Sequence, residues 1–124
     1  MKAQHPYDTR RTPPAAVLPF RVGLPRGETS VALVALVDSG ADLSVLPQGV
    51  VRQLGLPAIG EISVRGVGGT PRRVSLHAAQ VEVAGAQRVI EVVGVGQEAL
   101  LGRDLLNMWV VTLDGPGQVL RVET

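Results

Sequence analysis

Cysteine is absent from the 124-residue sequence, and only 2% of its residues are aromatic. The lack of cysteine excludes disulfides, thiolate nucleophiles and zinc–thiolate sites. The two histidines, His5 and His77, cannot form a metal cluster by themselves. Because aromatic side chains are so few, a packed core has to be built from Val, Leu, Ile and Ala, a composition that suits strands.

A strong excess of charge and a long hydrophobic run are also missing. The formal net charge is +1 and the basic residues are scattered, so the sequence predicts no nucleic-acid-binding surface. No stretch approaches the roughly 18 apolar residues that a membrane-spanning helix needs, and the first residues lack the apolar run of a signal peptide. We therefore expect a cytoplasmic protein with neither a membrane nor a nucleic-acid partner.

Polar residues and proline dominate the beginning of the chain, residues 1–16. Pro6, Pro13 and Pro14 interrupt this segment, and it shows no apolar period. Such a composition is typical of a flexible arm. Since the remaining length suits one hydrophobic core, we expect a flexible N-terminal arm over residues 1–16 and a single domain over residues 17–124.

Short apolar segments, most of them followed by a turn, fill the rest of the sequence. Helical signals are few: Pro47 is placed to open a short helix that ends at Gly55, and a second helical segment follows Leu100 and Leu101. Eight or more strands with little helix favour a small all-β barrel or sandwich. The expected strands cover residues 17–22, 30–37, 43–46, 61–67, 72–76, 76–83, 88–95, 109–113 and 119–122.

The most informative local pattern surrounds Asp38. This residue follows an apolar strand and precedes Ser39 and Gly40, so its carboxylate is presented at the end of a rigid element. Gly40 permits a tight turn whose N–H can point at the Asp38 oxygens, and Ala41 leaves room for a second chain to approach. Taken alone, Asp-Ser-Gly is more often a plain turn between strands than a catalytic site.

Two downstream segments give this turn a context. They are a glycine-rich hairpin around Val67-Gly68-Gly69 and the segment Leu100-Leu101-Gly102-Arg103-Asp104. In composition and order, the three motifs resemble those of the retropepsin-like aspartic proteases over about residues 17–113. The resemblance implies a small closed β-barrel-like acid-protease fold with a flap hairpin, one short helix after the Gly-Arg-Asp segment, and a homodimer. The C-terminal hairpin, residues 109–124, is more similar to non-viral members than to viral ones.

The same resemblance implies a role for each matching residue. Asp38 is the expected catalytic aspartate, and the residues after it support the active-site loop, with the Ser39 hydroxyl bonding across the dimer. Arg103 is expected to pair with Asp42, because a guanidinium and a carboxylate form two parallel hydrogen bonds. The full set is catalytic Asp38; supporting Ser39, Gly40 and Ala41; substrate-binding Asp42, Val67, Gly68 and Gly69; and bracing Arg103 and Asp104.

Peptide hydrolysis of this kind needs two carboxylates about 3 Å apart that share one proton. The sequence has one candidate, because no second Asp-Ser-Gly or Asp-Thr-Gly is present. A twofold homodimer that brings both copies of Asp38 to its axis meets the requirement. We expect an extended peptide or protein as substrate, and neither a metal nor another cofactor is needed.

Two hypotheses compete with that of an aspartic endopeptidase. The chain could be a catalytically silent module of the same fold that binds extended peptides or dimerises, since a fold does not entail an activity. It could also be a structural β domain in which Asp38-Ser39-Gly40 is only a turn. Trp109 is expected either in the dimer interface or in the core.

Overall fold

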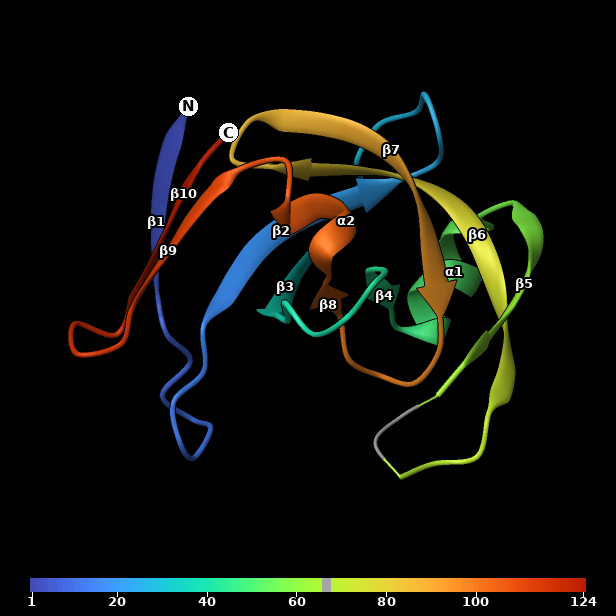
Figure 1. Cartoon of the computed structure of the whole chain (residues 1–124). Helices are drawn as coiled ribbons and strands as arrows, with labels where there is room; N and C mark the ends of the chain where they lie inside the picture. Colours follow the sequence, from blue (N-terminus) through green and yellow to red (C-terminus); the bar gives the residue numbers. More distant parts are fainter. Residues whose placement is uncertain (66–67) are drawn as a thin grey trace.

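The computed structural model of the protein describes residues 1–65 and 68–124, and strands dominate it (Figure 1). Side chains alternate between buried and exposed along several strands, as expected when one face of a sheet is covered. In β2, for example, Phe20 and Val22 are buried while Pro19 and Arg21 are exposed. The elements in chain order are β1 (Lys2–Pro6), β2 (Val17–Gly23), β3 (Val31–Val37), β4 (Val45–Leu46), α1 (Gln48–Leu54), β5 (Ala58–Val64), β6 (Arg72–Val83), β7 (Ala86–Gly94), β8 (Leu100–Leu101), α2 (Arg103–Leu106), β9 (Val110–Asp114) and β10 (Val119–Glu123).

Six strands close into a barrel in the order β2-β3-β8-β4-β7-β6, and β6 returns to pair with β2. The pairings of β3 with β8 and of β4 with β7 are parallel, and the others in the ring are antiparallel. β5 lies beside the ring and forms a hairpin with β6. The expectation of a small closed all-β barrel is thereby confirmed.

The longest strand, β6, belongs to both the barrel and the hairpin. The sequence predicted two arms over residues 72–76 and 76–83, but they form one strand because no turn residue separates them. Residues 72–77 pair with β5, and residues 76–83 pair with β7. The hairpin is therefore a direct extension of the barrel wall.

The barrel interior holds the main core, which consists largely of Val and Leu. Each such side chain, when fully buried, contributes roughly 1.5–3 kcal/mol relative to exposure. Leu105 of α2 is 0% exposed, so this helix packs against the core through one buried side chain. The largest fully buried apolar side chains are those of Leu46, Leu101, Leu105, Leu120, Val22, Val81, Val83, Val92 and Val122.

Both expected helical segments are present and short. α1 follows Pro47 and ends at Gly55, which adopts the left-handed conformation with φ of +63°. α2 begins at Arg103, within the Gly-Arg-Asp segment. Within the described part of the chain, neither helix has the length and apolar character needed to cross a membrane.

A second sheet, in the order β1-β10-β9, lies beside the barrel (left in Figure 1). Its strands are antiparallel, and β10 sends Leu120 and Val122 into the main core. Trp109, just before β9, is half-buried and packs against the same core. The terminal hairpin of β9 and β10 is thus anchored to the barrel through its inner face.

The beginning of the chain differs from the flexible arm that the sequence predicted. Lys2 to Pro6 form β1, which pairs with β10, and Asp8 bridges to Ala15. The sequence gives no sign of β1 because its side chains are mostly exposed, so no apolar alternation marks the strand. Backbone pairing with β10, rather than burial, holds it in place. The division into an arm and a domain at residue 17 stays a prediction.

The loop after β1 contains a carboxylate held in its charged form. Hydrogen bonds from the side chain of Arg10 and from its backbone N–H lower the pKa of Asp8 below its ordinary value. A lowered pKa in the folded protein adds stability above the unfolded pKa, and this stability is lost as the pH falls through the folded pKa.

Replacing Asp8 by asparagine is therefore expected to lower the free energy of unfolding slightly at neutral pH and to have no effect in strong acid. Urea unfolding of both proteins at about pH 7 and about pH 2 measures this difference. Glu91→Gln removes an exposed carboxylate from β7 and serves as the control. A difference between Asp8→Asn and the wild type that is independent of pH would contradict the assignment.

Candidate active site

Asp38 lies directly after β3, at the point where the chain leaves the barrel. Its backbone N–H donates to the carbonyl of Leu101 at 2.9 Å, and its own carbonyl accepts from the N–H of Ala41 at 3.2 Å. The Gly40 N–H donates to Oδ1 of the Asp38 carboxylate at 2.9 Å, as the sequence predicted. Asp38 is half-buried, whereas Ser39 and Gly40 are exposed. The carboxylate is therefore held by the Gly40 N–H, in a residue that keeps part of its surface exposed.

Arg103 spans the loop that carries Asp38. Its guanidinium donates to the carbonyl of Ser39 at 2.7 Å and forms an ion pair with the carboxylate of Asp42. Its backbone N–H donates to the carbonyl of Ala41 at 2.9 Å. Arg103 thus pairs with Asp42 as expected, but one nitrogen binds Asp42 and the other binds the Ser39 carbonyl, so the two parallel hydrogen bonds to one carboxylate are not formed. Since the Asp42 side chain is 85% exposed, the pair contributes at most about 1 kcal/mol to stability, and its main effect is to orient the loop.

Asp104 makes a second and more buried connection to the same loop. Its carboxylate accepts from the Ser44 hydroxyl at 2.8 Å and from the Ser44 N–H at 3.1 Å. It also accepts from the N–H of Leu105 at 3.0 Å. Ser44 is only 2% exposed, and it was not among the site residues that the sequence indicated. The one available signal is a hydroxyl residue inside the apolar run from Leu43 to Leu46.

Gly102 allows this close packing of β8 and α2 on the loop. Its N–H donates to the Ser44 hydroxyl oxygen at 3.0 Å. A Cβ atom at this position would lie 2.8 Å from the carbonyl oxygens of Ala41 and Leu43, closer than real Cβ contacts. Any side chain here would force the loop away from α2, so the glycine is required by the approach of two backbones.

A cleft of about 470 Å³ lies between the Asp38 loop and the β5–β6 hairpin. The loop and β4 supply part of the lining, β5 and the residue after it supply another part, and the end of β7 supplies the remainder. Most of the lining side chains are aliphatic, and they belong to a small apolar cluster that includes Val74 and Leu76 of β6. The lining residues are Gly40, Ala41, Asp42, Leu43, Val45, Ile62, Ser63, Val64, Arg65, Val93 and Val95.

The expected flap residues lie beyond β5. Val67 is outside the described residues. Gly68 and Gly69 are exposed in the segment before β6, and Gly68 has the positive φ, +67°, that the glycine-rich motif indicated. Neither glycine lines the cleft as it stands, and their contact with a substrate stays a prediction.

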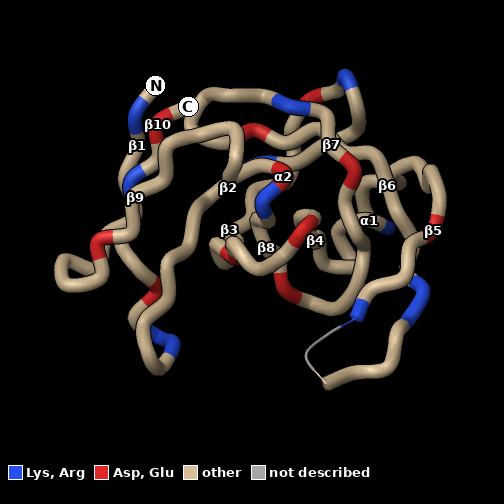
Figure 2. The backbone as a smooth tube through the Cα atoms, viewed as in Figure 1, with Lys and Arg blue, Asp and Glu red and all other residues tan. Residues whose placement is uncertain are grey.

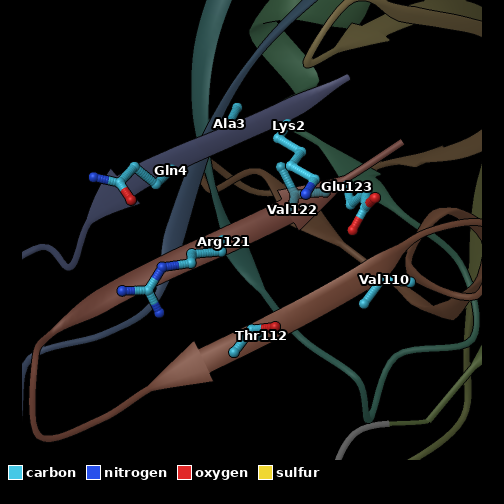
Figure 3. Close-up of a pocket in the computed structure, with 8 residues that line it drawn as sticks. All are labelled: Lys2, Ala3, Gln4, Val110, Thr112, Arg121, Val122 and Glu123. Carbon is cyan, nitrogen blue, oxygen red and sulfur yellow. The ribbon is translucent and has the colours of Figure 1, made fainter.

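A second concave surface, of about 370 Å³, lies on the terminal sheet (Figure 3). Side chains of Lys2, Gln4, Arg121 and Glu123 line it together with Val110 and other residues of β1, β9 and β10. No residue of the Asp38 loop contributes to it. Among the described residues, no group of three or more His, Cys, Asp or Glu side chains is arranged to hold a metal ion.

The closed barrel, the Asp-Ser-Gly loop after β3 and the Gly-Arg-Asp segment packed against it define the retropepsin-like aspartic protease fold. A crystal structure of a retropepsin-like aspartic protease from Rickettsia conorii is similar, with a TM-score of 0.68 and 17% identity over 98% of this chain and 91% of that one. The EIAV protease complexed with the inhibitor HBY-793 has a TM-score of 0.60 and 22% identity over 76% of this chain and 86% of that one. The foamy viral protease-reverse transcriptase matches with a TM-score of 0.60 and 18% identity over 77% of this chain, which spans only 12% of that protein.

The chain belongs to the family described as "gag-polyprotein putative aspartyl protease", whose sequence pattern matches residues 29–108. No match was found among curated protein sequences. The non-viral Rickettsia structure covers nearly the whole chain, whereas the EIAV structure covers 76% of it. This difference agrees with the expected likeness to non-viral members.

Proposed function

We propose that the protein is an aspartic endopeptidase that hydrolyses peptide bonds with two Asp38 carboxylates, one from each subunit of a homodimer. The observation that carries the proposal is the half-buried carboxylate of Asp38, which is held by the Gly40 N–H. Asp38 does not itself line the cleft, but the residues that follow it in the same loop, Gly40 to Leu43, do. The nearby carboxylate of Asp42 is already engaged by Arg103, so it is a poor candidate for the second catalytic group. A symmetry-related Asp38 supplies that group without any change in the fold.

In the proposed dimer, the two Asp38 carboxylates share one proton. One acts as the base on a water molecule, and the other acts as the acid toward the peptide carbonyl. The hydroxyl of Ser39 is exposed, and we assign it to a hydrogen bond across the twofold axis. Asp42 and the backbone of residues 67–69 are assigned to substrate binding, with residue 67 outside the described part of the chain.

The terminal hairpin is the proposed source of further dimer contacts. β9 is the last strand of its sheet, so one side of its backbone has no strand partner in the described chain. Its side chains Val110 and Leu113 are 63% and 58% exposed, which is high for apolar residues. Burial of such an edge against a second copy removes apolar area from water.

Digestion of an unbiased peptide library tests the proposal. Cleavage is expected between about pH 3 and pH 7, with products read by mass spectrometry, and a pepstatin-like inhibitor is expected to block it. Specific activity is expected to fall on dilution, in step with dimer dissociation followed by sedimentation. A chelator serves as the control and is expected to leave the rate unchanged. A chain that stays monomeric while cutting peptides at a concentration-independent specific rate would contradict the shared site.

A further inference from the structure

The β5–β6 hairpin carries an arginine directly after β5 and two more at the start of β6. Figure 2 shows basic residues on both arms of this hairpin. Arg65 follows β5 and lines the cleft, and Arg72 is the first residue of β6. Both arginines are exposed. Arg65 therefore borders the cleft, and Arg72 is exposed on the other arm of the same hairpin.

The strand register shows that Arg72 shares a face with the cleft-lining residues. It is the cross-strand partner of Val64, and directly paired residues in an antiparallel sheet project from the same face. Val64 lines the cleft, and Val74, two residues further along β6 on the same face, is 7% exposed in the adjoining apolar cluster. Arg72 thus continues the row of inward side chains past the end of that cluster.

Arg73 projects from the opposite face of the hairpin. Its cross-strand partner Ser63 also borders the cleft, but the Arg73 guanidinium binds the carboxylate of Glu61 at 2.9 Å, and Glu61 is not a lining residue. Within residues 1–65 and 68–124, by contrast, neither Arg65 nor Arg72 forms an ion pair. Arg72 and Arg73 therefore differ in the face of β6 on which they lie and in whether a carboxylate of the chain already engages the guanidinium.

Acidic and basic side chains lie on different sides of the cleft. The carboxylates of Asp38 and Asp42 lie on the loop side, and the charge of Asp42 is balanced by Arg103. The hairpin side carries the guanidinium groups of Arg65 and Arg72. An acidic side chain that approaches the hairpin side meets two cations there, and guanidinium–carboxylate contacts are strong and directional.

We propose that Arg65 and Arg72 select peptides that carry an acidic side chain facing the hairpin, together with an aliphatic side chain in the cleft. The proposal depends on the proposed function, because it assigns the specificity of the same cleft. An extended peptide presents alternate side chains to opposite sides, so one set faces the hairpin. The aliphatic lining of Leu43, Ile62 and Val64 accepts the apolar side chain.

The test uses two peptide pools that are identical except that Asp and Glu in one are Asn and Gln in the other. The wild-type protein is expected to cut the acidic pool about tenfold faster, measured as kcat/KM at low salt. Arg72→Gln is expected to reduce this preference to about twofold or less, while Arg73→Gln leaves it unchanged. Arg72→Glu is expected to favour peptides with Lys at the selected position. Added salt is expected to weaken the wild-type preference because it screens exposed charges.

Binding of the same pools to an Asp38→Asn variant separates the two proposals. Tighter binding of the acidic pool without any cleavage by the wild type would support the proposed charge selectivity and contradict the proposed protease activity. Cleavage of both pools at equal rates would contradict the proposed charge selectivity and would agree with the proposed protease activity. An equal loss of preference in Arg72→Gln and Arg73→Gln would also contradict the charge selectivity, because general surface charge would then explain the effect. Neither cleavage nor binding would overturn both proposals.

Discussion

Replacing Asp38 by asparagine is expected to reduce kcat/KM for any cleaved peptide by at least about 10⁴-fold, the scale found when a core catalytic group is removed. The amide has nearly the same shape as the carboxylate, and its oxygen can still accept from the Gly40 N–H. It cannot take or give the shared proton, so the chemistry stops while the fold and the dimer persist. Peptide cleavage followed by mass spectrometry, with circular dichroism and sedimentation for the fold and the dimer, measures these quantities.

Mixtures of the two chains give a sharper form of this test. At constant total protein, an equal mixture of wild type and Asp38→Asn contains about a quarter wild-type dimers if subunits exchange freely, so activity is expected to fall to about a quarter. Chains that act alone would keep about half of the activity. Mixing with Glu91→Gln, a change on the exposed face of β7, is expected to leave the activity at the wild-type level. Persistence of half the activity after full subunit exchange would rule out a site shared between two chains.

Local signals account for the parts of the fold that the sequence predicted well. Pro47 and Gly55 delimit α1 because proline suits the start of a helix and glycine its left-handed end. The pairing of Arg103 with Asp42 was implied by the resemblance to the retropepsin-like proteases, and the two side chains form that ion pair. For α1, residue type and position along the chain carried the information, whereas the ion pair joins residues 61 positions apart and was predicted only through the family motifs.

Other features depend on topology and could not be predicted. β1 has a polar exterior and is held by backbone pairing, so its side chains give no apolar alternation. The parallel pairings of β3 with β8 and of β4 with β7 join strands far apart in sequence. Ser44 looked like one more residue of a short strand, because its partner Asp104 is 60 positions away. The importance of this serine appears only once α2 is placed against the Asp38 loop.

Replacing Asp104 by alanine is expected to lower the free energy of unfolding by about 3 kcal/mol, since it removes three hydrogen bonds to a charged acceptor in a partly buried site. The Ser44 N–H and hydroxyl then lose their acceptor in a place where water has little access. The matched control is Asp42→Ala, which removes the exposed carboxylate bound to Arg103 and is expected to cost at most about 1 kcal/mol. Urea denaturation measures both changes.

A double-mutant cycle shows whether Ser44 and Asp104 act together. Ser44→Ala, Asp104→Ala and the double variant are expected to give a coupling free energy of about 1–2 kcal/mol, because the two side chains are in direct contact. Asp104→Asn is expected to lie between wild type and alanine, since its amide oxygen can replace only part of the carboxylate. Free-energy changes that add to within about 0.5 kcal/mol would show that the two residues are independent.

Because the same contact anchors the loop after Asp38, the destabilised variants are also expected to lose kcat at temperatures where they are still folded. Loss of stability with an unchanged kcat would show that Asp104 only holds α2 on the barrel and does not position the Asp38 loop for catalysis.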